Sequence, residues 1–276
     1  MKIALVTWSG LPPLSSDDGL LRDELLRHGA DVTAAVWDDP AVDWSSFDSI
    51  VLRSTWDYHK RLGEFAAWLE RMEPLPLWNP VRTVRPNLHK GYLLELERRG
   101  VPIVTTMLVP RGSSPGLLRE RKWRRAVVKP AVSATAFRTF VVNGETLDPA
   151  IEELLAQSDV LVQPFVDEIT SAGEWSLIFL GGTFSHAVLK TPAGGDFRVQ
   201  NEFGGFATPT RPNPHLIEQA ARVLETNGSP WLYARVDGVD RDGTFVLMEL
   251  ELTEPSLFLD ADPAAPGRLA TAVLAR

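Results

Sequence analysis

Three carboxylates near the end of the chain have the spacing of a divalent-cation site. Asp237 ends one apolar segment, and Glu249 and Glu251 lie two residues apart in the next. Because side chains alternate between the two faces of a strand, Glu249 and Glu251 share a face, and a loop near Gly243 would bring Asp237 opposite Glu249. Carboxylate oxygens gathered beside Arg235 suit Mg²⁺, with Mn²⁺ as an alternative, and a phosphate-bearing substrate.

The alternative is that these carboxylates form the solvated face of an edge hairpin, where alternating Glu is common. Val246, Leu247 and the residues between the acidic positions are apolar. Apolar residues on both sides of the acidic ones favour a site inside the protein over a face in water.

One lysine comes directly after a buried strand. The chain has only six lysines, and Lys129 follows two valines and precedes Pro130. A buried ammonium is costly unless an anion neutralises it, and a phosphate would serve. The other interpretation is a lysine at a strand end whose ammonium extends to water.

A second apolar strand, residues 161–166, contains Pro164. Proline cannot donate to a strand ladder, so the segment leaves backbone groups unpaired as it exits the sheet. Such a segment can hydrogen-bond a planar base through its backbone, although any strand exit offers similar groups.

Six short motifs, in chain order across residues 87–258, resemble those of the ATP-grasp superfamily. Each motif alone is weak evidence for this resemblance, but the set of six in this order is specific for it. The motifs are Lys90, Val128-Lys129-Pro130, Gln163-Pro164-Phe165-Val166, Gly173-Glu174-Trp175-Ser176, Tyr233-Ala234-Arg235-Val236-Asp237 and Glu249-Leu250-Glu251 with Pro255 beyond. Together with Arg53-Ser54-Thr55-Trp56-Asp57-Tyr58 and the tail 249–257, they make nearly the whole chain look most like the D-cycloserine-forming ATP-grasp ligases and their glutathione-synthetase-like relatives.

The resemblance implies roles for these residues. ATP phosphates would be bound by Lys90, Lys129 and Ser133, adenine by Gln163, Phe165 and Val166, and ribose by Glu174 or, alternatively, Glu168. Lys190 and Arg198 would line the phosphate and carboxylate region. Mg²⁺ would be held by Asp237, Glu249 and Glu251, the last standing where most of the superfamily has Asn. The catalytic candidates are Arg235, at the transferring phosphoryl group, Lys129 and Arg198.

The same resemblance places the substrate at an N-terminal loop. Arg53, Ser54, Thr55, Trp56 and Asp57 would bind it, with Arg53 or Arg198 forming a two-pronged contact to its carboxylate. One departure from the family concerns the loop 131–138, which normally carries glycines that allow closure over the triphosphate. This loop has no glycine, so close backbone approach is reduced, although Ser133 and Thr135 can still donate to phosphate.

The elements expected to position these residues alternate at first between strand and helix. Strands at about 2–8, 31–37 and 50–52, with helices after Ser15 and at 61–72, predict a parallel sheet whose ligands lie at the carboxyl ends of its strands. Proline-rich residues 74–86 mark a boundary. Asn87 is expected to cap a helix that runs through Arg99.

The second half has an antiparallel pattern. Asn143-Gly144 and Gly181-Gly182 predict hairpins, residues 213–227 a helix, and 232–236 with 245–252 the last strand pair. The fold class is therefore α/β plus α+β: an N-terminal parallel α/β domain over residues 1–84 and a two-lobed ATP-grasp module over 85–276, with a lid lobe at about 103–165.

Composition excludes several other classes of protein. The 276 residues include 28 Lys and Arg against 36 Asp and Glu, and the net charge of −8 argues against broad binding of nucleic acid. The chain has no cysteine, which excludes disulfides and thiolate chemistry. Every apolar run is interrupted by charge, so we expect no membrane segment and a cytoplasmic protein. A homodimer is possible.

The expected function is ATP-dependent carboxylate–amine ligation through an acylphosphate, with small-molecule carboxylate and amine-type substrates. Three alternatives stay open: a small-molecule kinase that stops after phosphoryl transfer, a nucleotide-binding pseudoenzyme or sensor, which the glycine-free loop does not exclude, and a two-domain sugar- or amino-acid-binding protein. ADP release that needs both a carboxylate and an amine distinguishes the ligase from all three.

Overall fold

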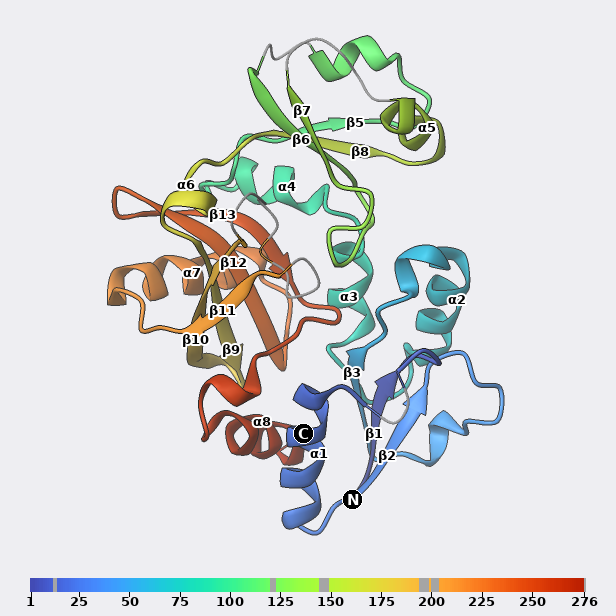
Figure 1. Cartoon of the computed structure of the whole chain (residues 1–276). Helices are drawn as coiled ribbons and strands as arrows, with labels where there is room; N and C mark the ends of the chain where they lie inside the picture. The colour runs from blue at the N-terminus through green and yellow to red at the C-terminus, as the bar shows by residue number, and fades with distance from the viewer. Residues whose placement is uncertain (12–13, 120–122, 144–148, 194–198, 200–203, 276) are drawn as a thin grey trace.

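Three β-sheets organise the chain in the computed structural model, which describes residues 1–11, 14–119, 123–143, 149–193, 199 and 204–275 (Figure 1). The N-terminal sheet is parallel, and the other two are antiparallel. This change from parallel to antiparallel pairing confirms the expected fold class of an α/β part followed by an α+β part.

The N-terminal sheet has the strand order β2-β1-β3-β4. Its strands are β1 (Lys2–Thr7), β2 (Asp31–Val36), β3 (Ser49–Ser54) and β4 (Leu77–Trp78). Helix α1 (Ser16–Arg27) begins at Ser15, whose side chain accepts the N–H of Asp18 and so satisfies one free donor of the first turn. Helix α2 (Leu62–Met72) buries Phe65, Trp68 and Leu69 against this sheet.

The lid-lobe sheet lies at the far end of the molecule from the N-terminus (Figure 1). It has the order β5-β8-β6-β7, with β5 (Met107–Val109), β6 (Arg125–Pro130), β7 (Phe140–Asn143) and β8 (Val160–Pro164). Helix α5 (Pro149–Gln157) packs its apolar side on this sheet through Ile151, Leu154 and Leu155.

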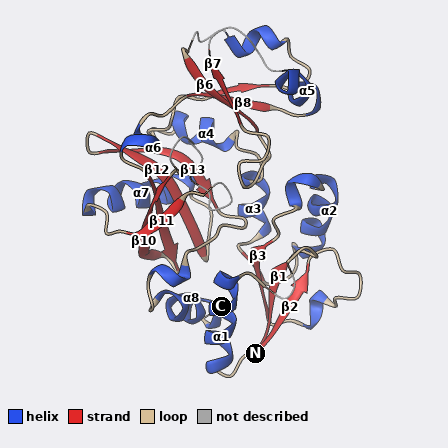
Figure 2. Ribbon diagram, in the orientation of Figure 1, coloured by secondary structure: helices blue, strands red, loops and turns tan. Residues whose placement is uncertain are grey.

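The large sheet has the order β11-β10-β9-β12-β13. It consists of β9 (Glu174–Leu180), β10 (Thr183–Thr191), β11 (Phe206–Pro209), β12 (Tyr233–Arg241) and β13 (Thr244–Glu251). Helices α4 (Tyr92–Arg98) and α7 (Pro214–Asn227) share one hydrophobic core with β9, β12 and β13. The short helix α6 (Glu168–Ser171) connects the lid lobe to β9 (Figure 2).

The last helix returns the chain to its beginning. Helix α8 (Ala265–Leu274) lies beside α1, and Leu269 and Val273 share a core with Leu21 and Leu25 (Figure 1). The segment between β13 and α8 therefore runs along the N-terminal domain, which places it next to the loop that follows β3.

One local expectation from the sequence is wrong. Asn87 does not begin a helix: it ends α3 (Val81–Asn87), and a separate helix, α4, follows. Its side chain instead donates to Leu250 O and accepts the N–H of Leu252. The hairpin predicted at Asn143-Gly144 would turn within residues 144–148, which lie outside the described residues; Asn143 is the last residue of β7, which pairs with the preceding β6.

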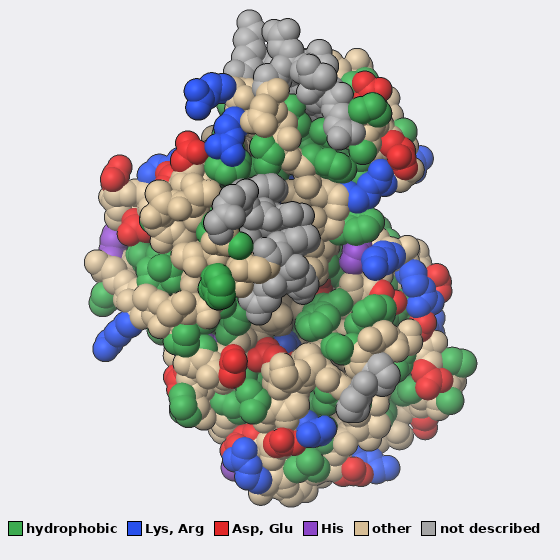
Figure 3. All heavy atoms as spheres, in the orientation of Figure 1, with side chains coloured by type: hydrophobic (Ala, Val, Ile, Leu, Met, Phe, Trp, Pro, Cys, Tyr) green, Lys and Arg blue, Asp and Glu red, His purple; other side chains and the backbone are tan. Residues whose placement is uncertain are grey.

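The hairpins at Gly181-Gly182 and at Asp242-Gly243 are confirmed. Among the described helices, none is both long and apolar enough to cross a bilayer. On the face shown in Figure 3, Lys and Arg side chains are interspersed with Asp and Glu and form no continuous basic surface. The division of the chain at residue 84 remains a prediction.

Candidate active site

A cavity lies between the lid lobe and the large sheet, and residues from all parts of the chain line it. The N-terminal domain contributes Trp56 and Tyr58, and the α3–α4 connection contributes Lys90. The lid lobe contributes Lys129 and 133–136 together with Gln163–Val166, and the large sheet and its tail contribute Glu174, Lys190, Arg235, Asp237, Glu249, Glu251, Glu254 and Ser256. Most of the residues singled out from the sequence therefore meet at one place.

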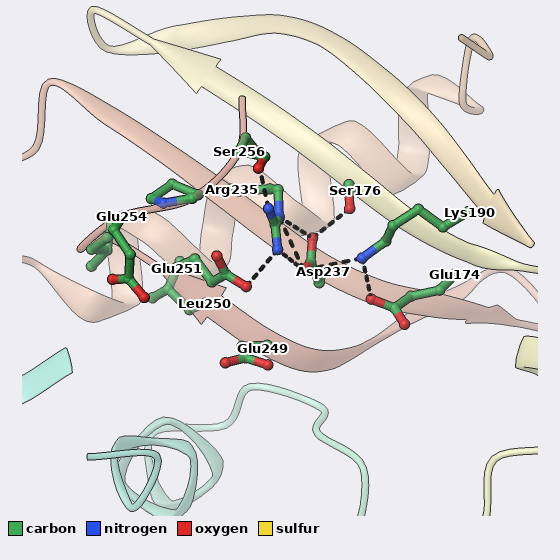
Figure 4. A network of polar contacts seen from close by, with 12 residues as sticks. Glu174, Ser176, Lys190, Arg235, Asp237, Glu249, Leu250, Glu251, Glu254 and Ser256 are labelled. Atoms are coloured by element: carbon green, nitrogen blue, oxygen red, sulfur yellow. Dashed lines mark hydrogen bonds and ion pairs between the residues drawn. The ribbon is translucent and has the colours of Figure 1, made fainter. Parts of the chain in front are cut away.

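The strand pair β12–β13 sets the acidic side of the cavity. Asp237 lies directly opposite Glu249, as its sequence position predicted, and Arg235 lies opposite Glu251. Arg235 donates to both Asp237 carboxylate oxygens at 3.0–3.1 Å and to Glu251 at 2.5 Å (Figure 4). Ser176 Oγ donates to Asp237 at 2.7 Å.

The pKa values of the three acids differ because their partners differ. Burial by itself would raise the pKa of each carboxyl. Arg235 and Lys190 hold that of Asp237 below its ordinary value, and Lys90 and Lys129 do the same for Glu249. For Glu251 burial outweighs the attraction of Arg235 and raises the pKa to about 7.

No three acidic or histidine side chains in the described ranges are already arranged as a metal site. Basic side chains lie between the carboxylates instead. Lys90 Nζ is 2.6 Å from Glu249. Lys190 Nζ is 2.6 Å from Glu174 and 3.4 Å from Asp237, contacts that Figure 4 draws. In this structure, therefore, the basic residues expected to face phosphate neutralise the acids expected to face metal.

Lys129 differs from the other two lysines of the cavity. No hydrogen bond or ion pair joins its ammonium to another residue of the described part of the chain, whereas Lys90 also donates to Ser133 O at 2.7 Å. Burial lowers the pKa of Lys129, more than the nearby Glu249 raises it. A half-buried ammonium that no described anion neutralises is a favourable place for a phosphate.

The glycine-free loop adopts the backbone conformation that glycine favours. Thr135, Ala136 and Arg138 have φ values of 50°, 52° and 48°. The hydroxyl of Ser133 donates to Pro130 O, so it is already used within the loop. Phe137 packs on His59 of the N-terminal domain with ring centroids 5.0 Å apart, which ties the loop to that domain.

The segment predicted to bind adenine lines the cavity, and only one of the two residues predicted to bind ribose does. The segment Gln163–Val166 lines the cavity, but the Gln163 side chain donates to Thr106 at 2.9 Å, which leaves the backbone as the group to meet a base. Arg125 lies 3.6 Å from the centre of the Phe165 ring. Glu174 lines the cavity, whereas Glu168 lies outside it and pairs with Arg241 at 2.5 Å.

The expected two-pronged contact from Arg53 to a substrate carboxylate is not supported by the structure. Arg53 is 2% exposed and does not line the cavity. Its guanidinium donates to Asp18 at 2.7 Å and to Pro255 O at 2.9 Å, because burial forces it to pair within the protein. Arg53 thus joins β3 to α1 and to the tail after β13.

Of the other loop residues, Trp56 alone lines the cavity. Ser54, Thr55 and Asp57 are buried away from it: Ser54 donates to Asp18, and Asp57 accepts from the Trp37 indole at 2.9 Å. Arg198, the other candidate for the substrate carboxylate, lies outside the described residues.

Sequence reasoning missed Glu254 and Tyr58 as lining residues. Glu254 lies three residues beyond Glu251, after the end of β13, and burial beside Glu251 raises its pKa to about 8. The sequence signal that could have identified Glu254 is an acidic residue directly before Pro255, in the segment that follows the acidic strand β13.

Solved structures share this three-sheet arrangement. The structure of D-alanine–D-alanine ligase from Bacillus anthracis complexed with ATP superposes with a TM-score of 0.72 at 15% identity, over 100% of this chain and 96% of that one. The fold and the cavity lined by lysines and carboxylates define an ATP-dependent ligase of the ATP-grasp class.

Closer matches identify the family. The cycloserine biosynthesis protein DcsG of Streptomyces lavendulae is 32% identical over an alignment of 297 positions that covers 99% of this chain and 98% of the relative. The crystal structure of D-cycloserine synthetase DcsG superposes with a TM-score of 0.90 at 31% identity, over 100% and 99% of the two chains. A family model for the DcsG N-terminal domain matches residues 3–79. The chain belongs to the D-cycloserine synthetase DcsG family.

Proposed function

We propose that this ligase activates the carboxylate of a small amino-acid-like substrate as an acylphosphate and transfers the acyl group to an amine-type nucleophile. The carboxylate oxygen attacks the γ-phosphorus of ATP and ADP leaves; the amine then attacks the acyl carbon and phosphate leaves. The observation that carries the proposal is one cavity that is lined by Lys129, which is paired with none of the described residues, and by the acids and Arg235 of β12–β13.

The two sides of the cavity have different partners in this proposal. The backbone of Gln163–Val166 and the nearby Glu174 would receive adenosine, and Lys129 would receive the phosphates. Arg235, already fixed by Asp237 and by the backbone oxygen of Ser256 at 3.0 Å, presents a permanent positive charge to the phosphoryl group. The chain thus supplies binding and charge, and little covalent chemistry.

Asp237, Glu249 and Glu251 fit a hard divalent cation, because all three offer carboxylate oxygens to the same cavity. When bound there, Mg²⁺ would offset the negative charge of the triphosphate. The basic residues now paired with these acids would be released to the phosphates at the same time. The acids and the basic residues now paired with them would therefore keep partners of opposite sign in both states.

The names of the related proteins suggest the substrate class. DcsG is named for the synthesis of D-cycloserine, a small cyclic amide derived from an amino acid. We propose the same class of product here, formed when the carboxylate and the amine-type nitrogen belong to one substrate molecule. The two groups then react at high effective concentration within the cavity.

Isotope transfer tests the reaction. A substrate labelled with ¹⁸O in its carboxylate should pass one ¹⁸O to the released phosphate, since the acyl–oxygen bond breaks when the amine attacks. Unlabelled phosphate would contradict the acylphosphate. ADP formation with a stable phosphorylated acid and no amide would select a kinase, and ATP binding without ADP formation would select a pseudoenzyme.

A further inference from the structure

Strand β13 lies at the edge of the large sheet, so its outer side has no neighbouring strand among the described residues. At the start of that side, Leu247 forms backbone hydrogen bonds with Pro102 and Val104. Farther along, Leu250 and Leu252 also direct backbone groups away from β12, because residues of an antiparallel strand alternate between facing the partner strand and facing away from it. The backbone that carries the candidate metal ligands therefore needs other partners.

Two side chains supply these partners. The N–H of Leu250 donates to the Tyr92 hydroxyl at 2.8 Å. The amide nitrogen of Asn87 donates to Leu250 O at 2.8 Å, and its amide oxygen accepts the N–H of Leu252 at 2.9 Å. The Thr253 hydroxyl donates to the same amide oxygen at 3.2 Å. Asn87 and Tyr92 thus take the place of a neighbouring strand along the last part of β13 and just beyond it.

The residues held in this way alternate with the two acids of β13. Glu249 directly precedes Leu250, and Glu251 lies between Leu250 and Leu252. The two leucines are each 1% exposed and pack in the core, which turns the acids to the opposite face, toward the cavity. Figure 4 shows the Glu251 carboxylate directed at Arg235. The orientation of both carboxylates therefore depends on how firmly the backbone of Leu250 is held.

We propose that Asn87 and Tyr92 are positioning residues for the divalent cation: they fix the backbone of β13 so that Glu249 and Glu251 keep the orientation needed to hold the metal. The inference rests on the proposed function, in which these acids bind Mg²⁺. Because Mg²⁺ demands near-ideal octahedral geometry, it tolerates displaced ligands poorly. Residues that orient metal ligands without touching the metal typically change its affinity by about 10–100-fold when they are replaced.

The contact of Lys90 with Glu249 cannot have this role. It occupies the carboxylate itself, so it has to be given up when Glu249 binds a metal. The bonds from Asn87 and Tyr92 end on the backbone of Leu250 instead, which leaves the oxygens of both acids free. These two side chains can therefore hold β13 in the same way with and without metal.

Calorimetric titration with ADP, once with EDTA and once with a fixed excess of Mg²⁺, tests the inference. The ratio of the two affinities measures how strongly the metal supports nucleotide binding. In Asn87→Ala this ratio should fall about tenfold, while the affinity in EDTA stays within about twofold of the wild type. Tyr92→Phe removes only the hydroxyl and should lower the ratio by about threefold, as expected for one hydrogen bond.

Thr83→Val is the matched control, because it removes a side chain–backbone bond from the same helix, α3, that does not reach β13. The Thr83 hydroxyl donates to Pro230 O at 2.6 Å, and Thr83 does not line the cavity. The variant should lower the unfolding temperature, which thermal denaturation in EDTA measures, and leave the ratio unchanged.

Three results would overturn the inference alone. They are a full Mg²⁺ effect in Asn87→Ala, an equal loss of that effect in Thr83→Val, which would indicate general destabilisation, and a loss of affinity in EDTA as large as that in Mg²⁺, which would make Asn87 a nucleotide contact. A wild-type protein without any Mg²⁺ effect would refute the metal assignment of the proposed function and this inference with it. Because no titration depends on turnover, a failed ligase reaction is recognised separately.

Discussion

Lys90 Nζ lies 2.6 Å from Glu249 Oε1, so a candidate phosphate ligand and a candidate metal ligand neutralise each other in this structure. Both side chains lie in the cavity, and the lysine is 7% exposed. Breaking such a pair leaves a charge in low dielectric without a partner, which costs more than the pair itself contributes.

We therefore expect Lys90→Met to lower the free energy of unfolding by about 2–4 kcal/mol. The double variant Lys90→Met/Glu249→Gln should recover most of this loss, because neither charge then remains. Chemical denaturation of the nucleotide-free protein measures both variants. Equal stability of the two would contradict the pairing.

In contrast to Lys90→Met, Lys129→Ala is not expected to destabilise the nucleotide-free protein. Because no described residue is paired with Lys129, the substitution leaves no orphaned charge, and the stability of the nucleotide-free protein should be unchanged or higher. Removing one charge-assisted phosphate contact should weaken ATP binding by about 1.5–3 kcal/mol, measured by calorimetry. Lys60→Ala, at an exposed lysine outside the cavity, should leave the affinity as it is.

Glu251→Gln tests the metal assignment. Without its charge, Mg²⁺ with ADP should raise the unfolding temperature much less than in the wild type, since stabilisation by a ligand follows its affinity. Removing one of several clustered acids should leave the metal-free protein about as stable as before. A full Mg²⁺-dependent shift in the variant would exclude Glu251 as a ligand.

Glycine substitutions at two alanines of the loop, Ala134 and Ala136, should have different effects on stability. Ala136 has a φ of 52°, so Ala136→Gly removes backbone strain and should leave stability unchanged or raise it by up to about 1 kcal/mol. Ala134 has no positive φ and packs on the N-terminal core, so Ala134→Gly should cost about 0.5–1 kcal/mol. Thermal denaturation compares them, and the opposite order would contradict the strain argument. If closure of the loop limits turnover, Ala136→Gly should also raise the rate of ADP release.

His59 should make the protein less stable in mild acid. Burial, with Lys60 and Lys90 nearby, lowers the pKa of His59 to about 4, against a smaller opposing effect of Asp57. Between pH 6.5 and 4 the unfolded chain therefore binds a proton that the folded chain does not, and stability falls as the pH falls. His59→Gln should remove about 1–2 kcal/mol of this loss between pH 7 and pH 5. Denaturation at pH 7 and pH 5 measures it, and parallel losses in both proteins would exclude His59 as the source.

The sequence by itself determined the features that depend on neighbours along the chain. The turn that joins β12 to β13 is local, and its register pairs Gly238 with Leu247. An irregularity between Asp237 and Gly238 then shifts the register by one residue and places Asp237 opposite Glu249 instead of Met248. The turn at Gly181-Gly182 is likewise local.

Only the tertiary structure decided the partners that lie far away in the chain. Arg53, predicted to meet substrate, meets Pro255, and Asn87, predicted to begin a helix, binds the backbone of β13. Glu254 becomes a cavity residue because the tail after β13 lies against Trp56, 198 residues earlier. A polar side chain near a strand end has the same local sequence signal whether it faces a ligand or a buried partner. Which of the two it meets depends on how distant segments pack, because burial obliges each charged or polar group to find its partner among whatever the fold brings beside it.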